Sequence, residues 1–335
     1  MATLSDVADA AGVSTASASL VLSGKAQGRV SQATADRVRA AAEDLGYVRD
    51  ALAGGMRNRR TRTVGVLGVR VLSTPYAVAM IDAILSACAE LGWSVLLTDS
   101  GGEPEPTRRA VRELRSRRVD VIVHAAMYHQ QVRVPAELDN VAVLNGFADR
   151  DDVVGVVPDE EAAARAAVTH LLELGHRRIG HLTQDVCAVA IGMRRAAYET
   201  TLREAGITPD PDLVIAAGQH PEQADAGARR LLDRQNRPTA VFCYNDGMAA
   251  GVYRTAAALG ISIPEQLSVV GFDDLRLIST NLAPQLTTMR LPHYEMADWL
   301  VRRLIHDDLP EPAGIHRFPC DLIVRNSTAP APPGA

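Results

Sequence analysis

Residues 3–22, TLSDVADAAGVSTASASLVL, predict two short helices joined by a tight turn. Thr3 is a good helix N-cap, and Asp6 three residues later completes a capping pattern near the positive end of the helix. Gly12 ends this helix, and Ser14 is a good N-cap for a second helix over residues 15–22. Apolar side chains recur at helical spacing in the first helix, at Leu4, Val7, Ala8 and Ala11. Two short helices joined by a glycine-containing turn are typical of the helix-turn-helix motif.

A third helix and a basic charge balance extend this module. From Ser31 through Val38 and Ala41 to Leu45 the apolar residues keep helical spacing, and Gly46 stops the pattern. Residues 1–62 hold nine basic and six acidic residues, so they carry +3 in a chain of net charge −5, and the remainder carries −8. A basic head on an acidic body suits a module that contacts DNA phosphates, attached to a body that DNA repels.

From Thr63 onward, predicted strands alternate with predicted helices, which is typical of parallel βαβ units. In the first half we expect strands at 63–69, 94–99, 119–125 and 141–146, and helices at 77–91 and 106–117. In the second half we expect strands at 176–183, 212–218, 239–246 and 267–274, and helices at 193–205, 222–234 and 247–258. Two similar α/β halves predict a bilobed clamp whose ligand lies at the strand ends facing the cleft.

Polar side chains stand where several of these strands end. Asn145 ends VAVLN, Asn245 and Asp246 end AVFCYND, and Asp273 and Asp274 end SVVGFDD. Such groups suit the recognition of ligand hydroxyls. Two of them have an alternative interpretation, because Asp246 can instead cap the next helix and Asp274 can be a surface turn residue.

The strings DVADAAGVSTASASLVLSG (6–24) and RVSQATADRVRAAAEDLGYVRDALA (29–53) resemble the head of the lactose/galactose repressor (LacI/GalR) family, and later motifs extend the resemblance over nearly the whole chain. The resemblance implies an all-α helix-turn-helix head plus an α/β bilobed periplasmic-binding-protein-like sensor with two parallel-sheet lobes. It further implies crossings between the lobes near 158–160, 289–291 and 320–322. The implied segments are the DNA-binding head (1–46), the hinge helix or linker (47–61), the N-terminal lobe (62–158 and 291–320), the C-terminal lobe (159–290 and 321–328) and a disordered tail (329–335).

In the resembling family the second helix enters the major groove, which implies that Thr15, Ala16 and Leu20 face base edges. Thr15 can donate or accept a hydrogen bond, and Ala16 or Leu20 can touch a thymine methyl; helix packing is the alternative for Leu20. Further expected DNA contacts, mostly to phosphates, are Thr3, Ser5, Ser14, Ser17, Ser23, Lys25 and Arg29.

Tyr47 through Met56 resembles the family's hinge helix, which lies in the minor groove when paired across a dimer. Met56 stands where the family has a leucine wedge that bends the duplex, and Ala51, Leu52 and Ala53 would supply the helix–helix contact. Gly54 and Gly55 depart from the pattern, and each costs about 1 kcal/mol of helix propensity relative to alanine. The alternative for 54–62 is a flexible, arginine-rich linker.

The resemblance also implies an effector pocket. By family correspondence Arg194, Asn245 and Asp273 occupy polyol-binding positions, and the further positions are Tyr76, His124, Asn145 and His220. Core packing is the alternative for Tyr76, and an exposed pair with Arg195 is the alternative for Arg194. The approach to this arginine reads A-I-G-M-R, without the family's threonine, and the family default for the ligand is a sugar or its derivative.

No motif of an enzyme or of a metal site occurs in the sequence. It has no dinucleotide fingerprint, P-loop, zinc-protease or serine-hydrolase motif, and His176 fits a hydrogen-bonding loop residue better than a catalyst. The scattered cysteines Cys88, Cys187, Cys243 and Cys320 predict separate reduced thiols. We therefore expect no catalysis, no metal and no cofactor.

The N-terminus has acids where a signal peptide has its positive charge, and no apolar run reaches the roughly 18 residues of a membrane span. These features predict a cytoplasmic protein without a membrane partner. The expected partners are palindromic double-stranded operator DNA, a sugar-like effector and a second copy of the chain in a homodimer. The leading interpretation is a repressor whose effector changes lobe closure; a solute-binding protein without regulatory DNA binding and an α/β enzyme are the alternatives.

Overall fold

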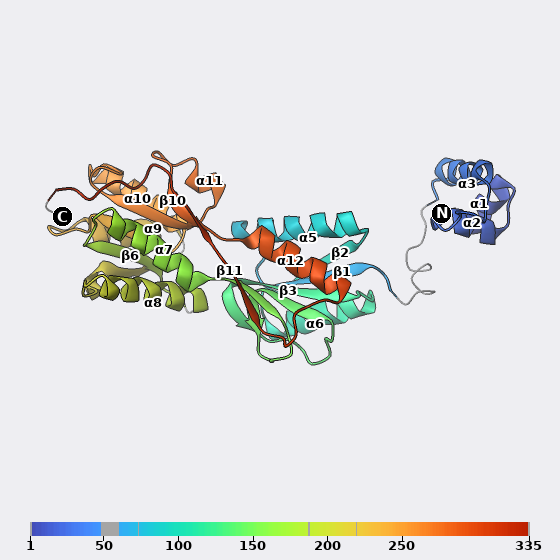
Figure 1. The fold of residues 1–335 in the computed structure, drawn as a ribbon, viewed down its shortest axis with the longest axis horizontal. Coiled ribbons are helices and arrows are strands. Elements are labelled where there is room, and N and C mark those ends of the chain that lie inside the picture. Colours follow the sequence, from blue (N-terminus) through green and yellow to red (C-terminus); the bar gives the residue numbers. More distant parts are fainter. Residues whose placement is uncertain (1, 48–59, 73, 187, 219, 334–335) are drawn as a thin grey trace. The chain divides into compact units, whose positions relative to one another are not determined.

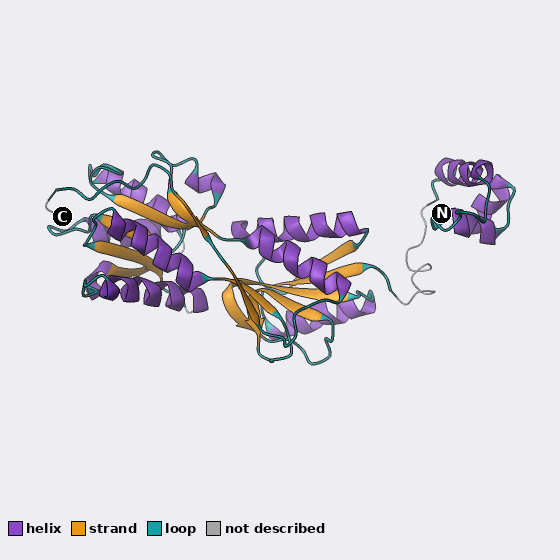
Figure 2. Cartoon of the chain, in the orientation of Figure 1, coloured by secondary structure: helices purple, strands orange, loops and turns teal. Residues whose placement is uncertain are grey.

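The computed structural model describes residues 2–47, 60–72, 74–186, 188–218 and 220–333. The chain divides into two units, Met1–Thr61 and Arg62–Ala335. In Figure 1 the first unit is a group of helices, and the second consists of two lobes. Figure 2 shows that each lobe has a central sheet with helices packed on both of its faces.

The first unit contains the helices α1 (Leu4–Ala11), α2 (Thr15–Leu22) and α3 (Gln32–Asp44). The Asp6 carboxylate accepts a 2.7 Å hydrogen bond from the Thr3 N–H, and the Thr3 hydroxyl accepts one from the Asp6 N–H. Gly12 ends α1 at φ 62°, a conformation that favours glycine, and the Ser14 hydroxyl caps α2. The predicted helix-turn-helix and its caps are therefore confirmed. Small and β-branched side chains form the core, among them Val7, Ala8, Ala18, Val21, Ala35 and Val38.

The N-terminal lobe is built on a six-stranded sheet in the order β11-β5-β4-β3-β1-β2, and all of its pairings are parallel. Helices α5 and α12 cover one face, and α6 covers the other. The strands are β1 (Thr63–Gly68), β2 (Ser94–Asp99), β3 (Val121–Val132), β4 (Val141–Ala148), β5 (Gly155–Pro158) and β11 (Ile315–Phe318). The helices are the 3₁₀ helix η1 (Pro75–Ala77), α5 (Val78–Leu91), α6 (Pro104–Ser116) and α12 (His293–His306).

The C-terminal lobe repeats this plan in the order β12-β10-β9-β8-β6-β7, with β12 antiparallel at the edge. Helices α7 and α8 cover one face of its sheet, and α9 and α10 cover the other. The strands are β6 (Ile179–Gln184), β7 (Val214–Ala217), β8 (Ala240–Cys243), β9 (Ser268–Asp273), β10 (Thr287–Arg290) and β12 (Asp321–Ile323). The helices are α7 (Glu160–Glu173), α8 (Val189–Glu204), η2 (Pro211–Leu213), α9 (Pro221–Leu232), α10 (Asp246–Ala258) and α11 (Arg276–Ser279).

The chain passes between the two sheets three times: from β5 to α7, from β10 to α12 and from β11 to β12. The connecting residues are 159, 291–292 and 319–320. Figure 1 shows these passages side by side at the junction of the lobes. Residues in or beside two of these connections, Glu160, Leu291 and His293, line the pocket between the lobes.

An irregularity in β3 shapes the cleft side of the N-terminal lobe. The register between β3 and β4 shifts between Ala125 and Gln130, so that four residues of β3 oppose the single residue Asn145 of β4. Two of the four, Tyr128 and His129, have φ values of 68° and 46°, which are uncommon for residues other than glycine. We call residues 126–129 the β3 bulge.

The C-terminal segment contradicts the expectation of a disordered tail in its first part. The Ala331 N–H donates to the Leu174 carbonyl at 2.8 Å, and the Ala329 carbonyl lies 3.1 Å from Nε2 of buried His176. The same His176 nitrogen lies 2.9 Å from the Ser268 hydroxyl. These bonds hold residues 329–331 on the C-terminal lobe. They also confirm the prediction that His176 is a hydrogen-bonding residue.

Candidate functional site

The first turn of α2 presents the predicted base-reading side chains. Thr15 and Ala16 are exposed, whereas Ala18 and Val21 on the same helix are buried in the core of the head. Leu20 lies between these extremes and is partly exposed. Since Thr15 and Ala16 follow the Ser14 cap, they lie at the positive end of the helix dipole, where an approaching phosphate is also stabilised.

The predicted phosphate contacts fall into two groups. The hydroxyls of Thr3, Ser14 and Ser17 take part in the helix caps, and that of Ser23 donates to the Leu20 carbonyl. The exposed side chains of Ser5, Lys25 and Arg29 form no hydrogen bond or ion pair within the described part of the chain. The hinge positions Ala51, Leu52, Ala53 and Met56 lie outside the described residues.

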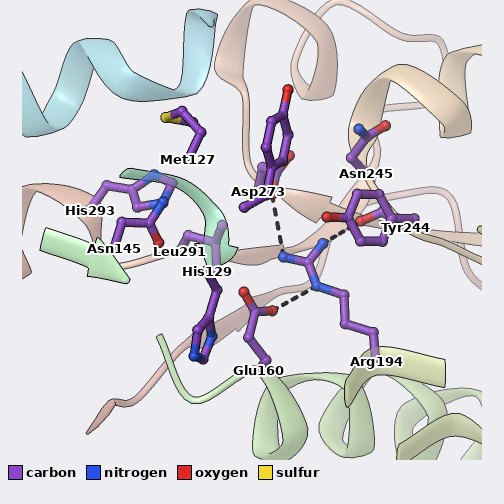
Figure 3. Close-up of a pocket in the computed structure, with 11 residues that line it drawn as sticks. Met127, His129, Asn145, Glu160, Arg194, Tyr244, Asn245, Asp273, Leu291 and His293 are labelled. Carbon is purple, nitrogen blue, oxygen red and sulfur yellow. Dashed lines mark hydrogen bonds and ion pairs between the residues drawn. The ribbon is translucent and has the colours of Figure 1, made fainter. Parts of the chain in front are cut away.

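A pocket lies between the lobes of the second unit (Figure 3). The C-terminal lobe supplies most of its charged groups, and the N-terminal lobe supplies the β3 bulge, the end of β4 and the start of α12. The lining residues are Met127, Tyr128, His129, Asn145, Glu160, Arg194, Tyr244, Asn245, Asp273, Leu291 and His293. The structure thus brings together four of the sequence-predicted positions, Asn145, Arg194, Asn245 and Asp273.

Arg194 of α8 is the centre of the polar network in this pocket (Figure 3). Its Nε donates to Glu160 Oε2 at 2.6 Å and its Nη1 to the Tyr244 carbonyl at 2.5 Å, while its Nη2 is 4.0 Å from Asp273 Oδ1. The guanidinium also lies over the Phe272 ring, 3.6 Å from the centroid. Only 3% of the Arg194 side chain is exposed, so the alternative of a surface pair with Arg195 is wrong.

Among the described residues, the Asp273 carboxylate has no side-chain partner closer than Arg194 Nη2 at 4.0 Å. Burial raises its pKa well above the ordinary value, although the charge of Arg194 acts in the opposite direction. Its backbone has φ 102°, and Asn145 across the pocket has φ 58°. Such conformations concentrate at ligand sites, where the surrounding structure holds them.

Two neighbouring acids differ from the expectations. Asn245, and not Asp246, caps α10: its Oδ1 accepts from the Met248 N–H at 2.9 Å, while the buried Asp246 carboxylate accepts bonds from Leu275 and Thr288. Asp274 is likewise not a surface turn residue. Its Oδ1 accepts from Arg325 Nη2 at 2.7 Å and from the Ser279 hydroxyl at 2.8 Å, and only 8% of its side chain is exposed.

Two predicted effector positions, His124 and His220, do not line the pocket between the lobes, and a third is described only by its backbone. His124 is buried on the α6 side of the N-terminal sheet, where it lines a different pocket. His220 is exposed and is the residue just before α9. Its N–H donates to the Gln223 side chain in the first turn of that helix. The backbone of Tyr76 lies in η1, and its side chain lies outside what the structure describes.

Several of the lining residues were not predicted from the sequence. Glu160 looks like an ordinary first-turn acid of a surface helix, yet only 3% of its side chain is exposed. His129 comes from the β3 bulge, where burial lowers its pKa and its Nδ1 has no hydrogen-bond partner among the described residues. For Glu160 the sequence offered one signal, the predicted crossing near 158–160, which includes this residue. For His129 it offered none.

Comparison with known proteins identifies the family. Residues 3–50 match the family model of bacterial regulatory proteins, lacI family, and residues 168–328 match the periplasmic binding protein-like domain. The chain is 32% identical over 301 residues to the HTH-type transcriptional repressor PurR of Vibrio atlanticus (strain LGP32), which covers 87% of each protein. It is 31% identical over 336 residues to the sucrose operon repressor of Escherichia coli, covering 98% of this chain and 100% of that protein.

The chain belongs to the LacI family. A solved LacI-family transcriptional regulator from Rhizobium etli is 30% identical with a TM-score of 0.74, covering 81% of this chain and all of that one. The complex of the regulator CelR with cellobiose is 26% identical with a TM-score of 0.68 over 98% of this chain and all of that one. The Lac repressor dimer bound to operator and anti-inducer is 24% identical with a TM-score of 0.82, covering 98% of this chain and 99% of that one, and it shares the fold.

The described part of this LacI-family chain contains neither a cluster of metal ligands nor a membrane-spanning helix. No group of three or more histidine, cysteine, aspartate or glutamate side chains there could hold a metal ion. Among the described helices, none is both long and apolar enough to cross a membrane.

Proposed function

We propose that this protein is a cytoplasmic transcriptional repressor that binds a palindromic operator as a homodimer and changes its operator affinity when a small polar metabolite binds between its lobes. The observation that carries this proposal is the joint presence of a capped helix-turn-helix and a polar cleft in one chain of the LacI family. A solute-binding protein for transport needs the cleft but has no use for the head.

The head supplies DNA contacts of two kinds. Thr15 and Ala16 present a hydroxyl and a methyl group at the start of α2, which suit hydrogen bonding to base edges and contact with a thymine methyl. Lys25 and Arg29 are exposed and unpaired within the described residues, so their charges are free for phosphates. Phosphate contacts fix the register of the head on the duplex, and the α2 side chains select the sequence.

The cleft favours an uncharged ligand with several hydroxyl or amide groups. The Arg194 guanidinium already contacts Glu160, and among the described residues no other arginine or lysine lines the pocket to meet an acidic ligand. Asp273 and Asn145 offer acceptors and donors from opposite lobes, and Met127 and Leu291 supply apolar wall. The related sucrose repressor and the CelR–cellobiose complex make a sugar or sugar-like metabolite the first class to test.

Apolar side chains that are exposed in the single chain support the proposed dimer. On α5, Val78 is 67% exposed and Leu85 is 50% exposed, with Leu72 just before the helix at 66%. Leu277 on α11 of the C-terminal lobe is 77% exposed. Exposed apolar patches of this kind mark interaction surfaces, and a second copy of the chain would cover α5 and α11 together.

Ligand binding changes DNA affinity only if the ligand favours one arrangement of the lobes over another. Asp273 and Arg194 belong to the C-terminal lobe and Asn145 to the N-terminal lobe, so a ligand that contacts all three favours the closed arrangement. Lobe closure changes the surface that the two α5 helices present to each other. The coupling expected for such a device is about 5- to 150-fold in operator affinity.

The test is a fluorescence-anisotropy titration of the full-length protein on the palindromes upstream of its own coding region, with scrambled duplexes as competitors. We expect at least roughly 10³-fold preference for one palindrome at physiological salt, and a change in affinity on adding a sugar or nucleoside. Asp273→Asn should lose the ligand response and keep DNA binding, whereas Glu222→Gln on the exposed face of α9 should keep both. No preference for any duplex, with or without ligands, would refute the proposal.

A further inference from the structure

The N-terminal lobe contains a second pocket that shares no lining residue with the pocket between the lobes. It lies on the α6 side of the sheet, and the chain that follows the β3 bulge forms one wall. We call it the N-lobe pocket. Its lining residues are Val69, Gly102, Pro104, Thr107, Arg108, His124, Gln130, Gln131, Val132, Arg133, Val134, Pro135, Ala136, Glu137, Asp149 and Arg150.

His124 of β3 is the unusual group in the N-lobe pocket. Only 2% of the residue is exposed, and neither ring nitrogen has a hydrogen-bond partner among the described residues. Burial lowers its pKa to about 4, against the opposing effect of Asp149, so the ring is neutral at neutral pH. A neutral imidazole has one donor and one acceptor, and leaving both unsatisfied in a protein interior is unfavourable.

The surroundings of His124 offer polar partners for a ligand but no free charge at the buried end. The Asp149 carboxylate accepts a 2.9 Å bond from the Val134 N–H, and Arg150 is paired with Asp152. The side-chain amides of Gln130 and Gln131 form no hydrogen bond within the described part of the chain. Apolar wall comes from Val69, Pro104, Val132 and Pro135.

We propose that the N-lobe pocket binds a second small ligand, an uncharged polar organic molecule that offers both a hydrogen-bond donor and an acceptor to His124. An amide, a hydroxyl or a heteroaromatic N–H group satisfies both ring nitrogens. A carboxylate does not, because it brings only acceptors to the ring; of the lining arginines, Arg108 is paired with Glu105 and Arg133 is exposed, away from the buried His124. This site is independent of the effector pocket and of the DNA-binding role proposed above.

The direct test observes the ring nitrogens of the full-length protein by NMR after selective ¹⁵N-histidine labelling. The probes are nicotinamide, its carboxylate counterpart nicotinate, and xylitol, each at millimolar concentration. We expect nicotinamide or xylitol to shift the His124 nitrogens, and nicotinate to shift them much less. If neither uncharged probe shifts them, or if nicotinate binds as tightly as nicotinamide, the proposal fails.

Two substitutions locate the binding. Ala136 is exposed and lines the N-lobe pocket, so Ala136→Trp should fill the pocket and abolish the nicotinamide shift. Asp139→Trp, at an exposed position of the same loop outside the lining set, is the matched control and should leave the shift unchanged. Loss of the shift in both variants, or in neither, would contradict binding at this site. Operator binding, measured in parallel, should be unaffected in both.

A second measurement separates a ligand site from a histidine that solvent already satisfies. His124→Leu should raise the melting temperature of the ligand-free protein by about 2 °C or more, because it removes two unsatisfied buried nitrogens. It should also abolish the nicotinamide shift of the melting temperature. A lower melting temperature for His124→Leu, together with an unchanged nicotinamide effect, would overturn the proposal.

Discussion

Nε of Arg194 and Oε2 of Glu160 lie 2.6 Å apart, and 3% of each side chain is exposed. Glu160 is the first residue of α7, immediately after the first passage between the lobes, and Arg194 is in α8. The pair therefore connects the arginine of the pocket between the lobes to the first segment that joins them. The strength of this pair bears on both stability and ligand response.

Removing one partner of the pair should be far more costly than removing an exposed arginine. Arg194→Ala leaves the Glu160 carboxylate buried and unpaired, so we expect a loss of about 3–5 kcal/mol in the free energy of unfolding. Arg195→Ala breaks only the exposed pair with Glu199 and should cost less than about 1 kcal/mol. Urea unfolding at neutral pH measures both. Similar losses for the two variants would show that the buried pair contributes no more to the free energy of unfolding than the exposed pair does.

Asp246 should make stability depend on pH. Burial raises its pKa from 3.8 to about 7, against bonds from Thr288 and Leu275, so the folded state binds a proton more tightly than the unfolded state. Its contribution is therefore fully present below about pH 4 and is lost as the pH rises towards 7.

The variant Asp246→Asn isolates this effect, because its amide can donate to the Thr288 hydroxyl while its oxygen accepts from the Leu275 N–H. The difference in unfolding free energy between variant and wild type should shift in favour of the variant by a few kcal/mol from pH 4 to pH 8. Taking the difference cancels the titration of the other groups. A difference that is flat over this range would mean that Asp246 does not titrate as stated.

Lys25 and Arg29 should contribute to DNA affinity without contributing to specificity. Each alanine substitution should weaken binding to operator and scrambled duplexes alike, and should lower the slope of log affinity against log salt by about 1. Arg39→Ala is the control, since Arg39 is paired with Asp36 on α3. Thr15→Ala should instead change the preference among operator sequences. A selective loss of operator binding in Lys25→Ala would assign that residue to base recognition.

Charged substitutions on the exposed apolar positions should dissociate the dimer. Leu85→Asp on α5 and Leu277→Asp on α11 would each place a carboxylate in the proposed contact, and sedimentation velocity should show a monomer. Val324→Asp, at a position 59% exposed beyond β12, is the control and should sediment as wild type. Should Leu85→Asp and Leu277→Asp remain dimeric, the interface lies elsewhere.

The C-terminal segment should be necessary for a stable C-terminal lobe. The Ser327 hydroxyl is buried; it donates to the Val269 carbonyl at 2.6 Å and accepts from the Thr287 N–H at 2.8 Å. Ser327→Ala leaves both backbone groups unsatisfied and should cost about 1–3 kcal/mol. Ser116→Ala, at the exposed end of α6, should cost less than about 0.5 kcal/mol in the same urea titration. Equal losses would mean that the bonds of Ser327 do not stabilise the C-terminal lobe.

Local signals explain what could be predicted from the sequence. Thr3, Gly12 and Ser14 determine the caps and the turn of the head from neighbouring backbone groups alone, and the observed α2 agrees with the predicted 15–22. Seven of the eight predicted strands begin and end within three residues of the predicted bounds, because they are short apolar runs; β5, β10, β11 and β12 were not predicted. Asn145 and Asp273 could be proposed for the pocket because parallel strands end at one edge of a sheet.

The rest depends on contacts between residues far apart in the chain. No pattern near Glu160 indicates that it is buried, because Arg194, 34 residues away, is what makes burial possible. The strand predicted at 119–125 continues to Val132 through a change of register that only β4 reveals. His124 was expected in the effector pocket, but the sequence does not show which face of β3 it occupies. The tail was expected to be disordered because its partner Leu174 lies in another part of the sequence.

The β3 bulge has a consequence for how this chain can diverge. Residues 127–129 line one pocket and residues 130–134 line the other, so a single insertion or deletion there would move the walls of both at once. Insertions and deletions within residues 127–134 would therefore be selected against. Substitutions that keep the length could alter the ligand specificity of one pocket without changing that of the other. Laboratory evolution of a new effector response should accordingly keep this strand at constant length.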